Sequence, residues 1–89
     1  MPIDRIALIQ ERLSGALSPL ALEVIDDSWQ HAGHAGARSG GHFTVNITSA
    51  AFEGKRLLQR HRLVYDALGE AMKTEIHALQ IHARAPSEG

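Results

Sequence analysis

The sequence contains no cysteine, which excludes disulfides, thiolate metal sites and thiol nucleophiles within this chain. Neither sign of charge is in excess, because nine Lys and Arg against ten Asp and Glu leave a formal net charge of −1 at pH 7. No overall charge therefore attracts the chain to nucleic acid or to an anionic membrane. Apolar runs fall short of the roughly 18 residues of a membrane span, and Asp4 and Arg5 interrupt the stretch where a secretory signal would lie. We expect a cytoplasmic protein without a membrane partner, in which this chain's own metal ligands are imidazole or carboxylate.

The composition is that of one folded domain. Hydrophobic residues make up 44% and charged residues 21% of the 89-residue chain, which is ordinary for globular proteins and enough for one modest core. We predict a single domain over 1–89, with a loop rich in glycine and histidine at 28–41 and a flexible tail at 85–89. The unusual feature is the presence of six histidines, which raise the question of metal binding. They are His31, His34, His42, His61, His77 and His82.

Hydrophobic spacing predicts a helix, two strands, a second helix and a third strand, in that order. The first helix ends before Pro19. The strands are expected over 20–26, 42–48 and 76–84. The connection 49–75 contains the second helix and is long enough for a right-handed parallel crossover, whereas the first two strands should be antiparallel. We therefore predict an α+β fold, a two-layer sandwich with a mixed three-stranded sheet.

The same spacing predicts which faces are buried. Strand 20–26 is apolar at most positions, so we expect it to be covered on both faces. Strand 42–48 alternates apolar and polar residues, so one face should meet the core. The second helix should bend near Gly69, where glycine in place of alanine costs a helix about 1 kcal/mol. Its apolar face comprises Leu57, Leu58, His61, Val64, Tyr65, Leu68 and Met72.

Several short blocks carry a resemblance to a known family. They read DDSWQHAGHAG at 26–36, HFTV at 42–45, FEGK at 52–55, QRHRLVY at 59–65 and IHAL at 76–79. In this order the chain resembles the BolA family from about residue 3 to residue 87. The resemblance implies a class II KH-like fold, which agrees with the topology predicted above. It also implies a heterodimer with a monothiol glutaredoxin and its glutathione, holding a shared 2Fe-2S cluster, and a transcription-regulating role in some bacterial members.

The resemblance also implies which residues bind the cluster. The family's ligand near the C-terminus corresponds to His77, and the second ligand comes from the glycine-rich loop, where His31 is the expected residue and His34 the alternative. The partner supplies the thiolates, and histidine is a known replacement for cysteine on one iron of such clusters. The competing interpretations are that His77 is a buried, hydrogen-bonded residue on the same strand face as Leu79 and Ile81, and that the loop histidines are merely solvated.

The other histidines have no assigned role. His61 falls in line with Leu57 and Val64 on the second helix, so we expect a packed side chain with a structural hydrogen bond. His42 and His82 are expected to be ordinary surface or edge residues.

One basic run offers a second candidate surface. It consists of Lys55, Arg56, Arg60 and Arg62. On a helix Arg56 and Arg60 stack four residues apart, while Arg62 can pair with Asp66. This surface could contact DNA phosphates or an acidic partner with its glutathione, although a solvated helix face is an equal alternative. The second glycine of a GXXG loop is missing after Gly54, so a KH-like shape does not indicate RNA binding.

No nucleophile and base arrangement is recognisable, so we expect a protein that is not an enzyme. The leading hypothesis is an adaptor in iron-sulfur cluster trafficking or in iron and redox sensing, acting with a monothiol glutaredoxin. The alternative is a DNA-binding transcriptional regulator that uses the basic second helix.

Overall fold

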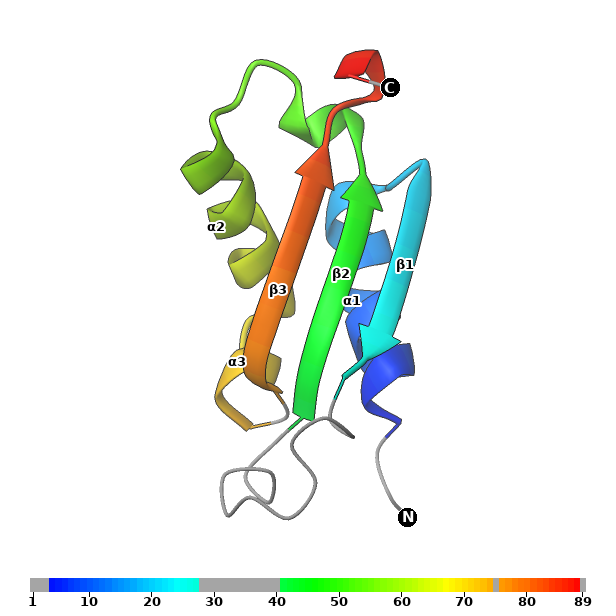
Figure 1. The fold of residues 1–89 in the computed structure, drawn as a ribbon, viewed down its shortest axis with the longest axis vertical. Helices are drawn as coiled ribbons and strands as arrows, with labels where there is room; N and C mark the ends of the chain where they lie inside the picture. The colour runs from blue at the N-terminus through cyan, green and yellow to red at the C-terminus, as the bar shows by residue number, and fades with distance from the viewer. Residues whose placement is uncertain (1–3, 28–40, 75, 89) are drawn as a thin grey trace.

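The computed structural model describes residues 4–27, 41–74 and 76–88, with the backbone alone at His77. Its helices and strands follow the predicted order (Figure 1). They are α1 (Arg5–Leu17), β1 (Ala21–Asp26), β2 (Gly41–Thr48), α2 (Leu57–Leu68), the short α3 (Ala71–Thr74) and β3 (Ile76–Arg84). Two 3-10 turns, η3 (Ala50–Phe52) and η4 (Pro86–Glu88), complete the chain.

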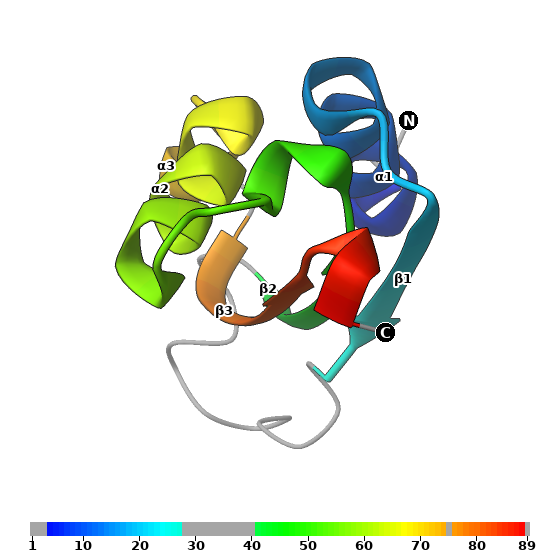
Figure 2. The same ribbon diagram turned by 90° about the horizontal axis from the view of Figure 1, so that it is seen from above.

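The three strands form one mixed sheet in the order β1-β2-β3. β1 is antiparallel to β2, and β3 is parallel to β2. The helices lie together on one face of this sheet, as the view from above shows (Figure 2). The predicted α+β sandwich with a mixed three-stranded sheet is therefore confirmed. No helix in the described part of the chain is long and apolar enough to cross a bilayer.

The core lies between the sheet and the helices. β2 is the central strand, and its side chains alternate between fully buried and half-buried positions, as predicted. α1 begins at Asp4, whose carboxylate accepts a hydrogen bond of 3.1 Å from the Ala7 N–H and so caps the first turn. The buried apolar residues of α1 and β2 are Ile9, Leu13, Leu17, Phe43, Val45 and Ile47.

β1 is less covered than the sequence predicted. Val24 is buried, but Leu20, just before the strand, is 75% exposed and Ile25 is 38% exposed. β1 forms one edge of the sheet, and the helices cover only one of its faces. The expectation that both faces would be covered is therefore wrong.

α2 buries a narrower face than expected. Val64 and Leu68 are fully buried, whereas Leu57 and Leu58 are 64% and 65% exposed. Figure 1 shows that the first turn of α2 lies to the side of the sheet, beyond β3. The helix ends at Gly69, the position where we predicted a break. Gly69 has φ +52°, so it terminates the helix in a conformation that suits glycine and does not weaken a helix interior.

The predicted flexible tail is ordered over 85–88. Ala85 is fully buried, and the Ser87 hydroxyl donates a hydrogen bond of 2.7 Å to a Glu53 carboxylate oxygen. Glu88 binds Arg60 of α2. These contacts hold residues 85–88 against the body of the fold, where the sequence predicted a flexible tail.

Candidate functional site

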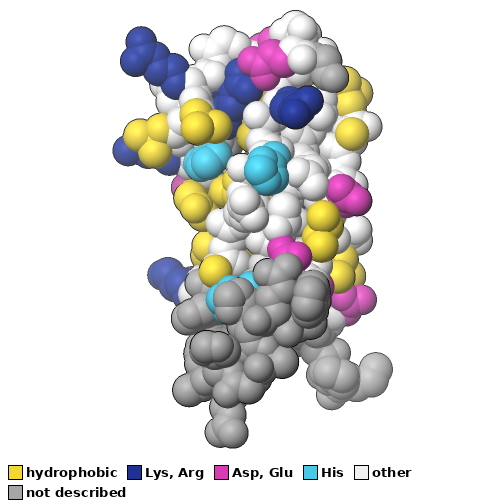
Figure 3. Space-filling model, viewed as in Figure 1, with side chains coloured by type: hydrophobic (Ala, Val, Ile, Leu, Met, Phe, Trp, Pro, Cys, Tyr) yellow, Lys and Arg dark blue, Asp and Glu magenta, His cyan; other side chains and the backbone are white. Residues whose placement is uncertain are grey.

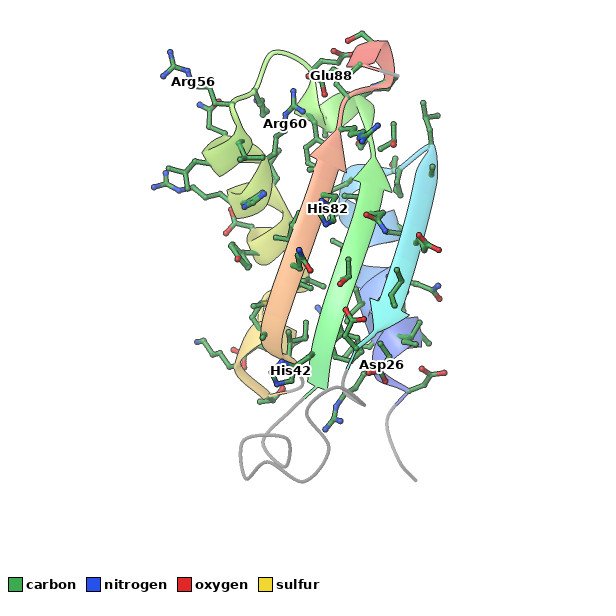
Figure 4. The ribbon with its side chains drawn as sticks, viewed as in Figure 1. Asp26, His42, Arg56, Arg60, His82 and Glu88 are labelled. Atoms are coloured by element: carbon green, nitrogen blue, oxygen red, sulfur yellow. The ribbon has the colours of Figure 1, made fainter. Side chains whose placement is uncertain are left out.

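Three strand ends meet at one end of the sheet. β1 ends at Asp26, while β2 begins at Gly41 and β3 begins at Ile76. Because β1 is antiparallel and β3 parallel to β2, these three positions meet at the same end of the sheet. Figure 4 shows Asp26 and His42 at this end, where segment 28–40 leaves and rejoins the described chain.

The ends of that segment are held by hydrogen bonds. The Asp27 N–H donates to the His42 carbonyl oxygen at 2.7 Å, which continues the pairing of β1 with β2 by one residue. The Thr44 hydroxyl donates to the Asp27 carboxylate, and the Gln80 amide oxygen lies 3.5 Å from the same hydroxyl. Asp27, just after β1, thus forms a polar cluster with Thr44 of β2 and Gln80 of β3.

His77 lies where the pairing of β2 with β3 is irregular. Gly41 is opposite Ile76 and His42 is opposite Ala78, so His77 is the extra residue of a bulge. Bulges re-aim side chains and occur often next to active sites. The regular register begins only at Ala78, opposite His42. The backbone at His77 therefore departs from regular strand pairing, which the sequence did not reveal.

The predicted loop ligands His31 and His34 lie outside the described residues, so the structure does not test them. In the described part of the chain, no group of three or more His, Asp or Glu side chains is arranged to hold a metal ion. His77 stays a prediction as the ligand at the sheet end.

The basic run does not form one continuous patch. Arg60 turns inward, and only 11% of its side chain is exposed. Its guanidinium donates to the Glu88 carboxylate at 2.6 and 2.7 Å, to the Ala83 carbonyl at 3.3 Å and to the Lys55 carbonyl at 2.9 Å. Arg60 therefore makes its contacts within the fold, and its part in a binding surface with Arg56 stays a prediction.

The ion pair changes the titration of both partners. The hydrogen bonds from Arg60, followed by the bond from the Ala85 N–H, lower the pKa of Glu88 from 4.5 to about 2. The hydrogen bond to Glu88 raises the pKa of Arg60. This pairing was missed from the sequence, since no local pattern connects a helix residue with the end of the chain.

The remaining cations of the run are exposed. Arg56 occupies the N-cap position of α2, and its backbone N–H donates to the Gln59 side chain at 2.9 Å. Among the described residues, Arg62 does not form the predicted ion pair with Asp66. Lys55, Arg56 and Arg62 are thus the part of the run that a partner could contact.

His61 is packed only in part as predicted. The residue is half-buried, but its Nε2 atom is inaccessible to solvent and has no hydrogen-bond partner among the described residues. The structural hydrogen bond that we expected is therefore absent at this nitrogen. A buried unpaired polar atom typically costs about 1–3 kcal/mol, so this position is unusual.

The face of the sheet opposite the helices is open. It carries a hollow of about 490 Å³ over β1, β2 and the end of β3. Inside it, the Asn46 amide donates to the Glu23 carboxylate at 3.0 Å. Figure 3 shows this face, with scattered charges of both signs and no single dominant patch. The lining residues are Ala21, Leu22, Glu23, Asn46, Ile47, Thr48, His82 and Arg84.

Comparison with known proteins identifies the family. Residues 13–88 match the family model described as BolA-like protein. The SufE-like protein 1, chloroplastic/mitochondrial, of Arabidopsis thaliana is 48% identical over 86 residues, covering 90% of this chain and 23% of that protein. The DNA-binding transcriptional regulator BolA of Escherichia coli is 45% identical over 74 residues, covering 83% of this chain and 69% of that protein.

The fold agrees with this assignment. The solved structure of the BolA domain of SufE1 from Arabidopsis thaliana has a TM-score of 0.86 and 46% sequence identity, and the match covers 100% of both chains. The family match, the sequence identities and the shared fold concern the same residues. This chain belongs to the BolA family.

Proposed function

We propose that this chain is an adaptor that forms a heterodimer with a monothiol glutaredoxin and its glutathione and shares a 2Fe-2S cluster with it. The pair would act in iron-sulfur cluster trafficking or in iron and redox sensing. The observation that carries the proposal is the convergence, at one end of the sheet, of His77 in a β-bulge with both ends of the segment that contains His31 and His34.

The donor set fits a shared cluster. The chain has no thiolate to offer, and its described residues form no complete metal site. His77 and one loop histidine would hold one iron, with His31 first and His34 as the alternative, and the partner's thiolates would complete the set. The cluster supplies electron transfer or iron content to a recipient. Four residues span at most about 14 Å of extended chain, so the covalent tether to Asp27 keeps His31 within reach of this sheet end.

The polar cluster supports the same assignment. Asp27 and His42 bracket the segment with a backbone hydrogen bond, and Thr44 joins Asp27 to the central strand. These bonds fix where the segment departs, which limits the conformational freedom that a loop ligand loses on binding. Since imidazole binds metal only when it is neutral, the shared site should lose its cluster under acidic conditions.

The test is the addition of the purified protein to a cluster-loaded monothiol glutaredoxin. We expect a change in the visible absorption and circular dichroism of the cluster, together with a heterodimer on a sizing column. Bovine serum albumin at the same concentration is the control for non-specific effects. An unchanged spectrum with both proteins eluting separately would refute the proposal.

A second candidate function is DNA-binding transcriptional regulation, which is favoured by the similarity to the DNA-binding transcriptional regulator BolA of Escherichia coli. The surface for it would be Lys55, Arg56 and Arg62, since Arg60 is held by Glu88. Binding through these cations should weaken linearly with the logarithm of salt concentration. A mobility-shift titration at several salt concentrations, with R56A/R62A as the test variant, decides this. Binding that is unaffected by both salt and substitution would contradict the assignment.

We propose a binding role and not a catalytic one. The buried Ser49 hydroxyl donates to the Leu17 carbonyl at 2.6 Å, so its proton is directed to a backbone carbonyl and not to a base that could activate it. We also keep the cytoplasm as the proposed location. The SufE-like protein 1 of Arabidopsis thaliana is named as chloroplastic and mitochondrial. Imaging of the fluorescently tagged protein to which this chain belongs tests its own location.

A further inference from the structure

A groove lies between the start of α2 and the outer edge of β3, away from the cluster site. It has a volume of about 280 Å³, below the roughly 300–1,000 Å³ of typical small-molecule sites. One wall is helical and the other is a strand. The lining residues are Leu57 and His61 from α2, with Ile81, His82, Ala83 and Arg84 from β3.

The strand wall presents backbone groups of a sheet edge with which no described strand pairs. β3 is the last strand of the sheet, and the Arg84 carbonyl accepts from the Ser49 N–H at the end of β2, so Arg84 points its backbone toward β2. Successive residues of a strand direct their N–H and C=O groups to opposite sides, so those of Ala83 and Ile81 point away from β2. The contact of the Ala83 carbonyl with Arg60 agrees with this direction. The N–H and C=O of Ile81 therefore face the groove side, as an edge open to pairing.

Arg60 and Glu88 close one end of that edge. Arg60 donates to the Ala83 carbonyl, and Glu88 accepts from the Ala85 N–H at 2.9 Å. These are the outward backbone groups that follow Ile81 along the strand. The ion pair thus blocks strand addition at the C-terminal end of β3 and leaves the part beside Leu57 open.

The side chains around the opening select the occupant. Leu57 is largely exposed, which offers an apolar contact, and Arg84 is an exposed cation of the lining, while the exposed Lys55 and Arg56 directly precede Leu57 in the chain. The wall also contains His61, whose buried Nε2 has no partner among the described residues. Figure 3 shows histidine next to hydrophobic side chains on the α2 side of this face. Among the described residues, no Phe, Tyr or Trp lines the groove, although aromatic stacking is the usual means of binding single-stranded nucleic acid.

We propose that this groove binds an extended segment of a partner protein, which adds to the edge of β3 as a fourth strand and carries acidic side chains next to apolar ones. Main-chain hydrogen bonds to β3 give the affinity of such a contact, and alternate side chains give its specificity. The contact leaves the sheet end with His77 free, so one partner here and another at the cluster end can bind together.

The test uses a fluorescein-labelled peptide, Glu-Val-Glu-Val-Glu-Val, with blocked ends. We expect it to bind with shifts of the Ile81 and Ala83 backbone amides and of the His61 ring in NMR spectra. A peptide methylated on alternate backbone nitrogens should bind far more weakly, because it cannot donate to the edge. The matched peptide with Lys in place of Glu should also bind more weakly, because of the basic rim.

Protein variants distinguish peptide binding in the groove from non-specific binding. Leu57→Ser should weaken peptide binding about fivefold, whereas Leu20→Ser removes an exposed leucine beside the other sheet edge and should leave binding unchanged. Shifts confined to β1, equal binding of the methylated peptide, or no binding at millimolar peptide would overturn the proposal. Tighter binding of oligothymidine at the same residues would overturn the proposal and identify nucleic acid as the occupant of the groove. Concentration-dependent self-association through this edge would overturn it and identify a second copy of this chain as the occupant.

Discussion

The two terminal nitrogens of Arg60 lie 2.6 and 2.7 Å from the two carboxylate oxygens of Glu88, which joins α2 to the turn that ends the described chain. The same pair binds the Ala83 carbonyl and the Ala85 N–H. An arginine and carboxylate in this bidentate geometry fix direction as well as charge. One ion pair therefore orders the C-terminal turn and closes the end of the β3 edge.

The first prediction concerns acid stability. The pKa of Glu88 is lowered from 4.5 to about 2, so the ionised carboxylate stabilises the fold above pH 4.5. This contribution is lost as the pH falls from 4.5 toward 2. Glu88→Gln should unfold a few degrees below the unchanged protein at pH 7, and the gap should close toward pH 2 in thermal melts followed by circular dichroism. Glu70→Gln, an exposed control, should show no gap, and a gap that persists at pH 2 would contradict the charge argument.

Local periodicity was enough to predict the elements. The strict alternation around Phe43 and Val45 reflects a strand with one covered face, and that pattern is visible in the sequence itself. The exposure of Leu57 and Leu20 was not visible, because it depends on where each element overhangs its neighbour. Periodicity reports which residues share a face, while the three-dimensional packing decides whether that face is covered.

The candidate site was predicted only in outline. The matched family blocks pointed to His77, but the bulge around it depends on the pairing of β3 with β2 and has no signal in the local sequence. The basic run was read as a surface because neighbouring cations on a helix usually face solvent. Arg60 departs from that pattern because Glu88, distant in sequence, lies beside it in the fold.

The second prediction concerns the buried Ser49. Its hydroxyl donates to the Leu17 carbonyl at 2.6 Å and accepts from the Ala51 N–H at 3.1 Å, and the side chain is fully buried. Ser49→Ala leaves both backbone groups without a partner and should lower the free energy of unfolding by about 1–3 kcal/mol. Urea unfolding measures this. Ser14→Ala, exposed on α1, should be neutral or slightly stabilising, and an equal loss there would point to a general effect of removing serine.

The third prediction compares two glycines. Gly69 has φ +52° and ends α2, whereas Gly15 lies in α1 with nothing within 4 Å of an added Cβ. Gly69→Ala should destabilise by about 1–2 kcal/mol because an L side chain is strained at positive φ. Gly15→Ala should stabilise by about 0.5–1 kcal/mol through helix propensity. Opposite shifts of the urea midpoint are expected, and a gain at Gly69 would mean that it behaves as a helix-interior residue.

The last prediction separates cluster ligands from other histidines. His77→Ala and His31→Ala should each weaken the spectrum of the cluster shared with glutaredoxin, because each removes one imidazole from the iron. His82→Ala is the matched control, since His82 is exposed further along the same strand, and His61→Ala tests the histidine between the arginines. Both should retain the spectrum, and thermal melts should show that the ligand variants remain folded. If His34→Ala is damaging and His31→Ala silent, the loop ligand is His34. If His77→Ala retains the spectrum and His61→Ala loses it, the ligand assignment is wrong. The iron would then be bound at α2, because the bulge would hold no ligand.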